Sequence, residues 1–222
     1  MNYVKRLVRL ILGLFVCAVG LYLSIRANIG LAPWDALNVG IEMRAGISYG
    51  NASVLIGLAV ILADIFLKEK IGVGTVLNTI LIGKFVDLLN YMDILDYQEN
   101  FFVGVIMLLV GQFVLCIGSY LYMGAEMGCG PRDSFLVAFV RRVHKAPIGI
   151  VKFVIEFTVL VMGWALGAKV GLGTVICMFG ISIIMQITFD LLRFDVKALH
   201  HEDIADTFRN IFHSFDKTAH VR

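Results

Sequence analysis

The sequence of 222 residues is strongly apolar, with 59% hydrophobic and 16% charged residues and a mean hydropathy of +0.86. Soluble domains carry about a quarter charged residues, so the composition excludes an ordinary soluble domain and favours a lipid bilayer as the surroundings. The net charge of +2 says little about partners by itself, and we expect none among nucleic acids.

Six apolar segments are each long enough to cross a bilayer core, which takes about 17 to 25 residues of helix. They comprise residues 7–25, 51–67, 74–92, 101–123, 148–167 and 173–192. A small globular protein could not bury so many helices that are apolar on every side. The sequence therefore predicts an all-α membrane protein with six transmembrane helices.

The sequence also repeats itself. The phrase GLAPWD at 30–35 returns 98 residues later as GCGPRD at 128–133, and GVGTV at 72–76 returns 99 residues later as GLGTV at 171–175. The phrases VDLL and FDLL, at 86–89 and 189–192, align only if four further residues are inserted. Each copy holds three spans, and an odd number of spans places the second copy in the opposite orientation.

We therefore predict two inverted-topology repeats followed by a tail. The first repeat covers 1–98, the second covers 99–194, and 195–222 form a cytoplasmic tail. In the tail, apolar residues recur at helical spacing and predict an amphipathic helix: Ile204, Phe208, Ile211, Phe212 and Phe215.

The basic residues indicate the orientation. With a cytoplasmic amino terminus, thirteen of the nineteen Lys and Arg residues fall on the cytoplasmic side. This is the bias that bacterial membrane proteins show. We expect a multi-pass protein of the bacterial inner (plasma) membrane, with its amino and carboxyl termini in the cytoplasm.

Each copy of the repeated motif predicts a short half-helix, at about 33–44 and 131–142. Proline suits the first position of a helix, where its missing N–H would have no partner. Glycine permits the bend before it, and non-helical backbone at membrane depth must be buried in protein or line a cavity. The motif residues are Gly30, Pro33, Gly128 and Pro131.

Asp35 and Asp133 fall in the first turn of these half-helices, where a carboxylate meets the positive end of the helix dipole. Two readings are open. The aspartate caps an extramembrane turn, or the two half-helix ends meet near the middle of the membrane, and the capping and midplane roles are compatible with each other.

Several residues beside the motifs are candidates for binding a solute. Trp34 and Arg132 occupy the same position of the two copies, and could offer a stacking surface and an anion-binding group. We assign substrate binding to Asp35, Asp133, Trp34, Arg132, Arg26, Asn28 and Glu126, the last three lining the approaches. Lys152 and Glu156, four apart in one span, are predicted to form an intramembrane charge pair.

The sequence contains no hydrolase, zinc-protease or phosphate-binding motif. The four cysteines have no metal-type spacing and the five histidines lie near or beyond the cytoplasmic surface. We expect no enzymatic activity, no cofactor and no metal. A membrane enzyme is the weakest alternative, because the acids lack an accompanying nucleophile.

The doubled Gly-x-x-Pro-x-Asp phrase, the Gly-x-Gly-Thr segments and the length resemble the YczE/YyaS bacterial integral membrane proteins, grouped loosely with YitT-like proteins. The resemblance covers about residues 7–194 and implies an inner-membrane protein without indicating a substrate.

The leading functional prediction is a transporter or channel for a small polar solute, with a site between the two half-helices. The alternative is a membrane protein without transport activity that binds a partner protein, with the tail as the candidate contact. A homo-oligomer is compatible with either.

Overall fold

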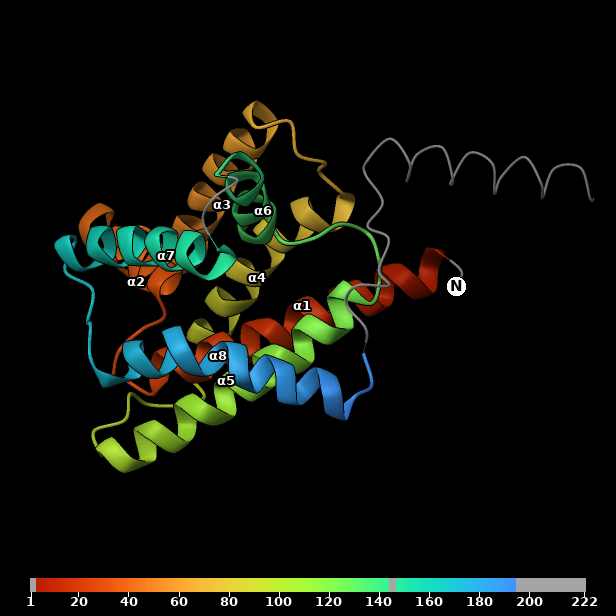
Figure 1. The fold of residues 1–222 in the computed structure, drawn as a ribbon. Helices are drawn as coiled ribbons and strands as arrows, with labels where there is room; N and C mark the ends of the chain where they lie inside the picture. The colour runs from red at the N-terminus through yellow and green to blue at the C-terminus, as the bar shows by residue number, and fades with distance from the viewer. Residues whose placement is uncertain (1–2, 144–146, 195–222) are drawn as a thin grey trace, which may run out of the picture.

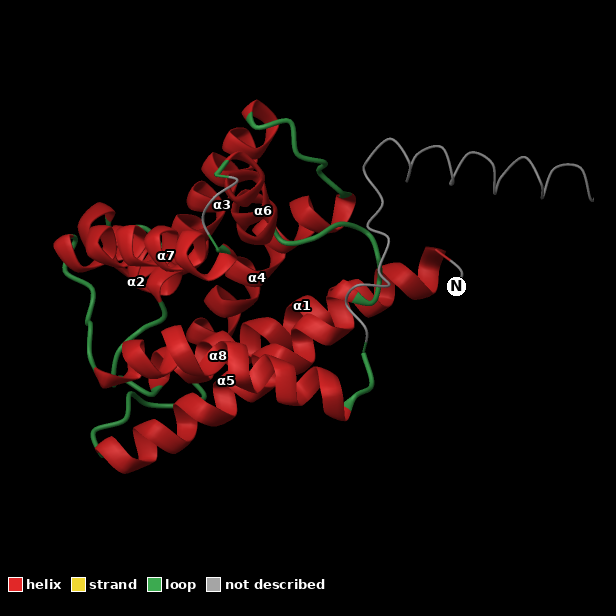
Figure 2. Ribbon diagram, viewed as in Figure 1, coloured by secondary structure: helices red, strands yellow, loops and turns green. Residues whose placement is uncertain are grey.

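The computed structural model describes residues 3–143 and 147–194, which form eight α-helices and no strands (Figures 1 and 2). The helices are α1 (Tyr3–Arg26), α2 (Pro33–Ala45), α3 (Tyr49–Phe66), α4 (Val73–Met92), α5 (Phe101–Met123), α6 (Pro131–Arg142), α7 (Ile148–Ala165) and α8 (Leu172–Leu191). The predicted tail of 195–222 lies outside the described residues.

The prediction of six membrane-spanning helices is confirmed. In the described part of the chain, α1, α3, α4, α5, α7 and α8 are each long and apolar enough to cross a bilayer. The two remaining helices are short, with 13 residues in α2 and 12 in α6. Both begin at the proline of the repeated motif, where the helix has no use for the N–H that proline lacks.

Helices α1 and α5 pack along each other and carry α4 and α8 on their flanks (Figure 1). Glycine makes the α1–α5 contact close, because a β-carbon on Gly20 would lie 2.6 Å from the carbonyl oxygen of Gly111. A β-carbon on Gly118 would lie 2.5 Å from the amide nitrogen of Cys17. Small residues are the usual means by which helices approach closely in membranes.

Each short helix packs against a spanning helix from the other half of the chain. Helix α2 lies against α7, and α6 lies against α3 (Figure 1). Here too glycine sets the separation, since a β-carbon on Gly163 of α7 would lie 2.6 Å from the amide nitrogen of Leu37. The short helices are therefore embedded among the spans.

The later helices of the two halves correspond with a constant shift. Helices α3 and α7 both have 18 residues, α4 and α8 both have 20, and each pair starts 99 residues apart. The four-residue insertion needed to align Asp87 with Asp190 is therefore wrong, because equal helix lengths leave no room for it. By helix position Asp87 corresponds to Gln186.

Candidate functional site

The loops before α2 and α6 have the same backbone form. Asn28 and Glu126, 98 residues apart, both have a φ of 56°. Gly30 and Gly128 have φ values of 125° and 122°. Residues with a side chain strongly disfavour backbone conformations with φ near these two values, so only glycine suits the two positions. Glu126 is therefore part of the backbone bend before α6. Its carbonyl oxygen accepts a hydrogen bond from Nη2 of Arg6 at 2.8 Å.

Each loop binds the first turn of a spanning helix from the other half. The amide of Gly173 in α8 donates to the carbonyl oxygen of Ile29 at 2.9 Å, and the amide of Gly74 in α4 donates to that of Met127 at 2.7 Å. Each bond pairs a loop carbonyl with an amide in the first turn of a helix, where the amide has no partner within its own helix. The repeated Gly-x-Gly-Thr phrases therefore form the surfaces on which the two loops pack.

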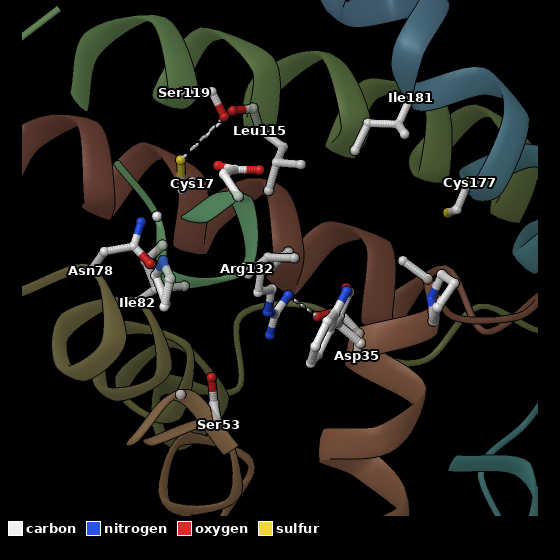
Figure 3. Close-up of a pocket in the computed structure, with 18 of the residues that line it drawn as sticks. Cys17, Asp35, Ser53, Asn78, Ile82, Leu115, Ser119, Arg132, Cys177 and Ile181 are labelled. Carbon is white, nitrogen blue, oxygen red and sulfur yellow. Dashed lines mark hydrogen bonds and ion pairs between the residues drawn. The ribbon is translucent and has the colours of Figure 1, made fainter. Parts of the chain in front are cut away.

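A cavity of about 300 Å³ lies where α2 and α6 begin (Figure 3). The first turns of both helices line it, as do α1, α3, α4, α5, α7 and α8. Its ionisable and polar lining residues include Asp35, Asp133, Arg132, Glu156, Asn78, Gln112, Ser53 and Ser119. The structure thus brings both copies of the Pro-x-Asp motif to one cavity among the spans.

Asp35 is held deep in the cavity wall, with 3% of its surface exposed. The hydroxyl of Tyr49 donates to its Oδ1 at 2.9 Å, and Nη1 of Arg132 lies 3.9 Å from the same oxygen. The Tyr49 hydroxyl in turn accepts from Nδ2 of Asn38 at 3.3 Å. A buried carboxylate requires such donors, because burial without them costs several kcal/mol, about 2 to 7 for a neutral polar group and more for a charge.

Asp133 has a different environment although it occupies the same position in the repeat. Its residue surface is exposed, and Oδ2 accepts a hydrogen bond from the hydroxyl of the buried Tyr122 at 3.4 Å. The two aspartates are thus unequal, Asp35 being the enclosed one and Asp133 the accessible one.

Trp34 and Arg132 contact each other across the cavity. The guanidinium carbon of Arg132 lies 5.0 Å from the centroid of the Trp34 ring, within the range of a cation–π contact. In Figure 3, Arg132 extends toward Asp35, and Ser53 lies on the opposite side of the cavity from Ser119. The guanidinium therefore joins the first turn of α6 to that of α2.

Arg26 and Asn28 lie elsewhere, at a second cavity of about 710 Å³. Arg26 forms an ion pair with Asp93 at 2.9 Å, and Oδ1 of Asn28 accepts from Nζ of Lys169 at 2.8 Å. We call this cavity the vestibule. It is lined by Ile25, Arg26, Asn28, Gly30, Leu31, Val39, Glu42, Met43, Tyr49, Asn90, Tyr97, Gly167 and Lys169.

Lys152 and Glu156 lie 3.8 Å apart on α7, and Nζ of Lys152 also donates to the Ser182 hydroxyl of α8 at 3.4 Å. Both charged residues line a third cavity of about 180 Å³. It shares wall residues with the central cavity: Trp34, Arg132, Asp133, Glu156, Ile181 and Met185. The central cavity therefore continues along the α7–α8 side of the protein.

Three residues of the site escaped prediction from the sequence. Tyr49 and Tyr122 hold the two aspartates, but neither has a tyrosine at the equivalent position of the other repeat. Gln112 is buried in α5, where Nε2 donates to the Ser24 hydroxyl at 3.3 Å. Its Oε1 has no hydrogen-bond partner within the described ranges. A polar residue in the middle of the span 101–123 was the available signal for Gln112.

Metal binding finds no support in the described residues, since no group of three or more His, Cys, Asp and Glu side chains is close enough to hold an ion. Cys17 and Cys177 line the central cavity as free thiols.

Comparison with known proteins places the sequence in a recognised group. Residues 4–190 match a family described as "Family of unknown function (DUF6198)". An uncharacterized protein of Haemophilus influenzae is 32% identical over 183 residues, which cover 82% of this chain and 83% of the relative. No solved structure matches the chain significantly.

Two Bacillus subtilis relatives bear the names that the sequence resemblance suggested. The uncharacterized membrane protein YczE is 29% identical over 74% of this chain and 76% of its own length. The uncharacterized protein YyaS is 25% identical over 76% of this chain and 86% of its own length. The resemblance to the YczE/YyaS proteins is confirmed.

Proposed function

Because the chain belongs to the DUF6198 family, whose function is unknown, we propose its function from the central cavity: it is a transporter or channel for a small polar solute. The observation that carries the proposal is that the first turns of both short helices line the central cavity together. A volume of about 300 Å³ is at the lower end of the range for ligand sites, which suits a small solute.

The inverted-repeat arrangement belongs to the same proposal. Its support is the reciprocity of contacts: the loop of each half binds the span of the other half, through Ile29 to Gly173 and Met127 to Gly74. The pairing of α2 with α7 and of α6 with α3 is reciprocal in the same way. Many transporters place a solute site between such repeats, at the ends of interrupted helices.

The membrane placement follows from charge. With the amino terminus in the cytoplasm, Arg141 and Arg142 at the end of α6 lie on the cytoplasmic side and the acidic α4–α5 connection lies outside. We assign the protein to the bacterial inner membrane in this orientation. The vestibule, which contains Asn90 and Tyr97, then faces outward.

Within the site, exposure assigns the roles. Asp133 and Arg132 can reach a solute directly, because Asp133 is exposed and about a third of the Arg132 side chain is accessible. Asp35 is enclosed by Tyr49 and Arg132, so we assign it the positioning of Arg132. Oε1 of Gln112, which has no partner among the residues the structure describes, offers an additional acceptor, since a buried acceptor without a partner favours a donor on the ligand.

A binding screen tests this function. The purified protein is heated in detergent with a panel of small polar solutes, including amines, amino acids, carboxylates and sugars. A ligand present at 100 times its Kd stabilises a folded protein by about 2.7 kcal/mol, which raises its melting temperature. We expect at least one solute to stabilise the wild type and not the Asp133→Asn variant. The matched control is Asp96→Asn, an exposed acid of the α4–α5 connection outside the cavity.

A solute that stabilises wild type, Asp133→Asn and Asp96→Asn equally would place binding outside the central cavity. That result would contradict the proposed site. A stabilising solute that depends on Asp133 is then carried into a flux assay.

A further inference from the structure

Tyr49 stands between the vestibule and the central cavity. Tyr49 lines the vestibule, and its hydroxyl donates to Asp35, which lines the central cavity. Tyr49 has 1% of its surface exposed and belongs to an apolar cluster that also contains Leu21 on the central side and Leu31 on the vestibule side. One layer of side chains therefore separates the two cavities.

On the opposite side the described residues form no matching layer over the central cavity. By the shift of 99 residues, Ile148 occupies the position of Tyr49, and it is 58% exposed. The central cavity instead shares its wall with the third cavity beside Lys152 and Glu156. Access is thus closed at the vestibule and continues along α7 and α8.

Contacts between the spans explain this difference. Helices α3 and α4 approach closely, since a β-carbon on Gly83 would lie 2.9 Å from the carbonyl oxygen of Gly50. At the equivalent place, Gly149 of α7 has nothing within 4 Å among the described residues. Asp87 of α4 also stabilises the α3–α4 contact. Its carboxylate accepts hydrogen bonds from the Ser48 hydroxyl at 2.6 Å and from the Gly50 amide at 2.7 Å.

Side-chain size acts in the same direction. The small pair Ser53 and Gly83 between α3 and α4 is replaced between α7 and α8 by Lys152 and Ser182, which meet only through the long lysine side chain at 3.4 Å. A lysine needs more room than a serine, so α7 is held further from α8.

We propose that Tyr49, held by Asp35, is the gate between the vestibule and the central site, and that the α7–α8 side is the open entrance. This inference rests on the proposed function, because a gate matters only where a solute passes. The Tyr49 hydroxyl and the Arg132 guanidinium both interact with the same oxygen, Oδ1 of Asp35. A solute that moves Arg132 from its present 3.9 Å therefore alters the surroundings of the carboxylate that holds the Tyr49 hydroxyl.

The test measures access to a single cysteine in the central cavity. Ser53→Cys, half-buried in the cavity wall, is placed in a chain whose four native cysteines are alanine. A membrane-impermeant maleimide is applied to intact cells and to inside-out vesicles, which expose opposite faces. Met43→Cys in the vestibule and Val143→Cys after α6 mark the two faces.

With Tyr49 present, we expect Ser53→Cys to react from the face marked by Val143→Cys and not from the face marked by Met43→Cys. Adding Tyr49→Ala should raise the labelling rate of Ser53→Cys from the vestibule face at least about tenfold. The substitution removes both the hydrogen bond to Asp35 and the packing of the ring, which stabilise the closed state. Tyr49→Phe, which keeps the ring, should raise the rate about fivefold.

The matched control is Tyr22→Phe. Tyr22 is equally buried, and its hydroxyl is hydrogen-bonded to the backbone of Leu95, away from the gate. Tyr22→Phe should leave the labelling of Ser53→Cys unchanged. Asn78→Cys, a second reporter in the central cavity, replaces Ser53→Cys if that variant does not fold.

Rapid labelling of the central cysteine from the vestibule face with Tyr49 intact would overturn the gate. So would unchanged protection in Tyr49→Ala while Met43→Cys still reacts. Labelling needs no transported solute, so the gate can fail while Asp133-dependent binding persists. Conversely, the gate can hold while no solute is found to bind, which would contradict the proposed function alone.

Discussion

Nη1 of Arg132 lies 3.9 Å from Oδ1 of Asp35, and the two residues come from different copies of one repeated motif. Arg132 belongs to the first turn of α6 and Asp35 to the first turn of α2. This contact joins the two halves at the centre of the molecule. It lies beside the cavity in which we place the solute.

The first prediction concerns this contact. Arg132→Gln leaves Asp35 with the Tyr49 hydroxyl but without a cation, so thermal unfolding in detergent should occur at a lower temperature. Because about a third of the Arg132 side chain is exposed, solvent weakens the pair, and we expect a loss of about 1 kcal/mol. Arg141→Gln removes an arginine that pairs with Glu69 and is 69% exposed, and should change stability less.

The second prediction concerns the α1–α5 contact. Gly20→Ala would bring a β-carbon to 2.6 Å from the backbone of α5, and the overpacking should destabilise the fold by about 1 to 3 kcal/mol. Gly180→Ala is the matched control, because its β-carbon meets nothing closer than 3.7 Å. Denaturation in detergent compares the two. Equal stability of both variants would show that α1 and α5 do not pack this closely.

The third prediction concerns the loop before α2. Gly30→Ala combines a φ of 125° with a β-carbon 2.8 Å from the amide of Thr174, so it should cost more than the 1 to 3 kcal/mol that is roughly typical of backbone strain. Gly46→Ala also has a positive φ, of 65°, but open space around the β-carbon. It should cost only about 1 to 2 kcal/mol. Expression and melting temperature measure both, and a smaller loss in Gly30→Ala would contradict the seating of this loop on α8.

The fourth prediction concerns Gln112. Gln112→Leu removes a buried acceptor that has no partner among the described residues, so it should weaken solute binding. It also removes the hydrogen bond from Nε2 to Ser24, which should lower stability by about 0.5 to 1.5 kcal/mol. Thermal shift with a stabilising solute measures the first effect, and melting without solute measures the second. Ser119→Ala, another change at the cavity wall, controls for altered packing.

Much of the fold can be predicted from the sequence, because segment length and local residue preferences determine where the helices lie. The lengths of the apolar segments predict the spans, and proline at a first helical position predicts the starts of α2 and α6 at Pro33 and Pro131. The glycine that opens each motif, Gly30 and Gly128, is predictable too, because its repetition at equivalent positions indicates a shared backbone bend.

The site was predicted less completely, because its contacts join residues far apart in the chain. Trp34 and Arg132 were recognised as the differing pair of the repeat, but their mutual contact depends on how α2 and α6 meet. Tyr49 has no repeat equivalent, so the comparison of the two halves passes over it. Arg26 and Asn28 lie at the vestibule because α1 ends there, which their distance in sequence from Asp35 does not indicate.

Solute flux into proteoliposomes tests the central claim most directly, with a solute identified by thermal shift. We predict rapid uptake by the wild type and by Asp96→Asn. Asp133→Asn combined with Arg132→Gln should lose uptake, provided that both proteins elute as folded particles. Undiminished uptake by the folded double variant would contradict a solute site between α2 and α6.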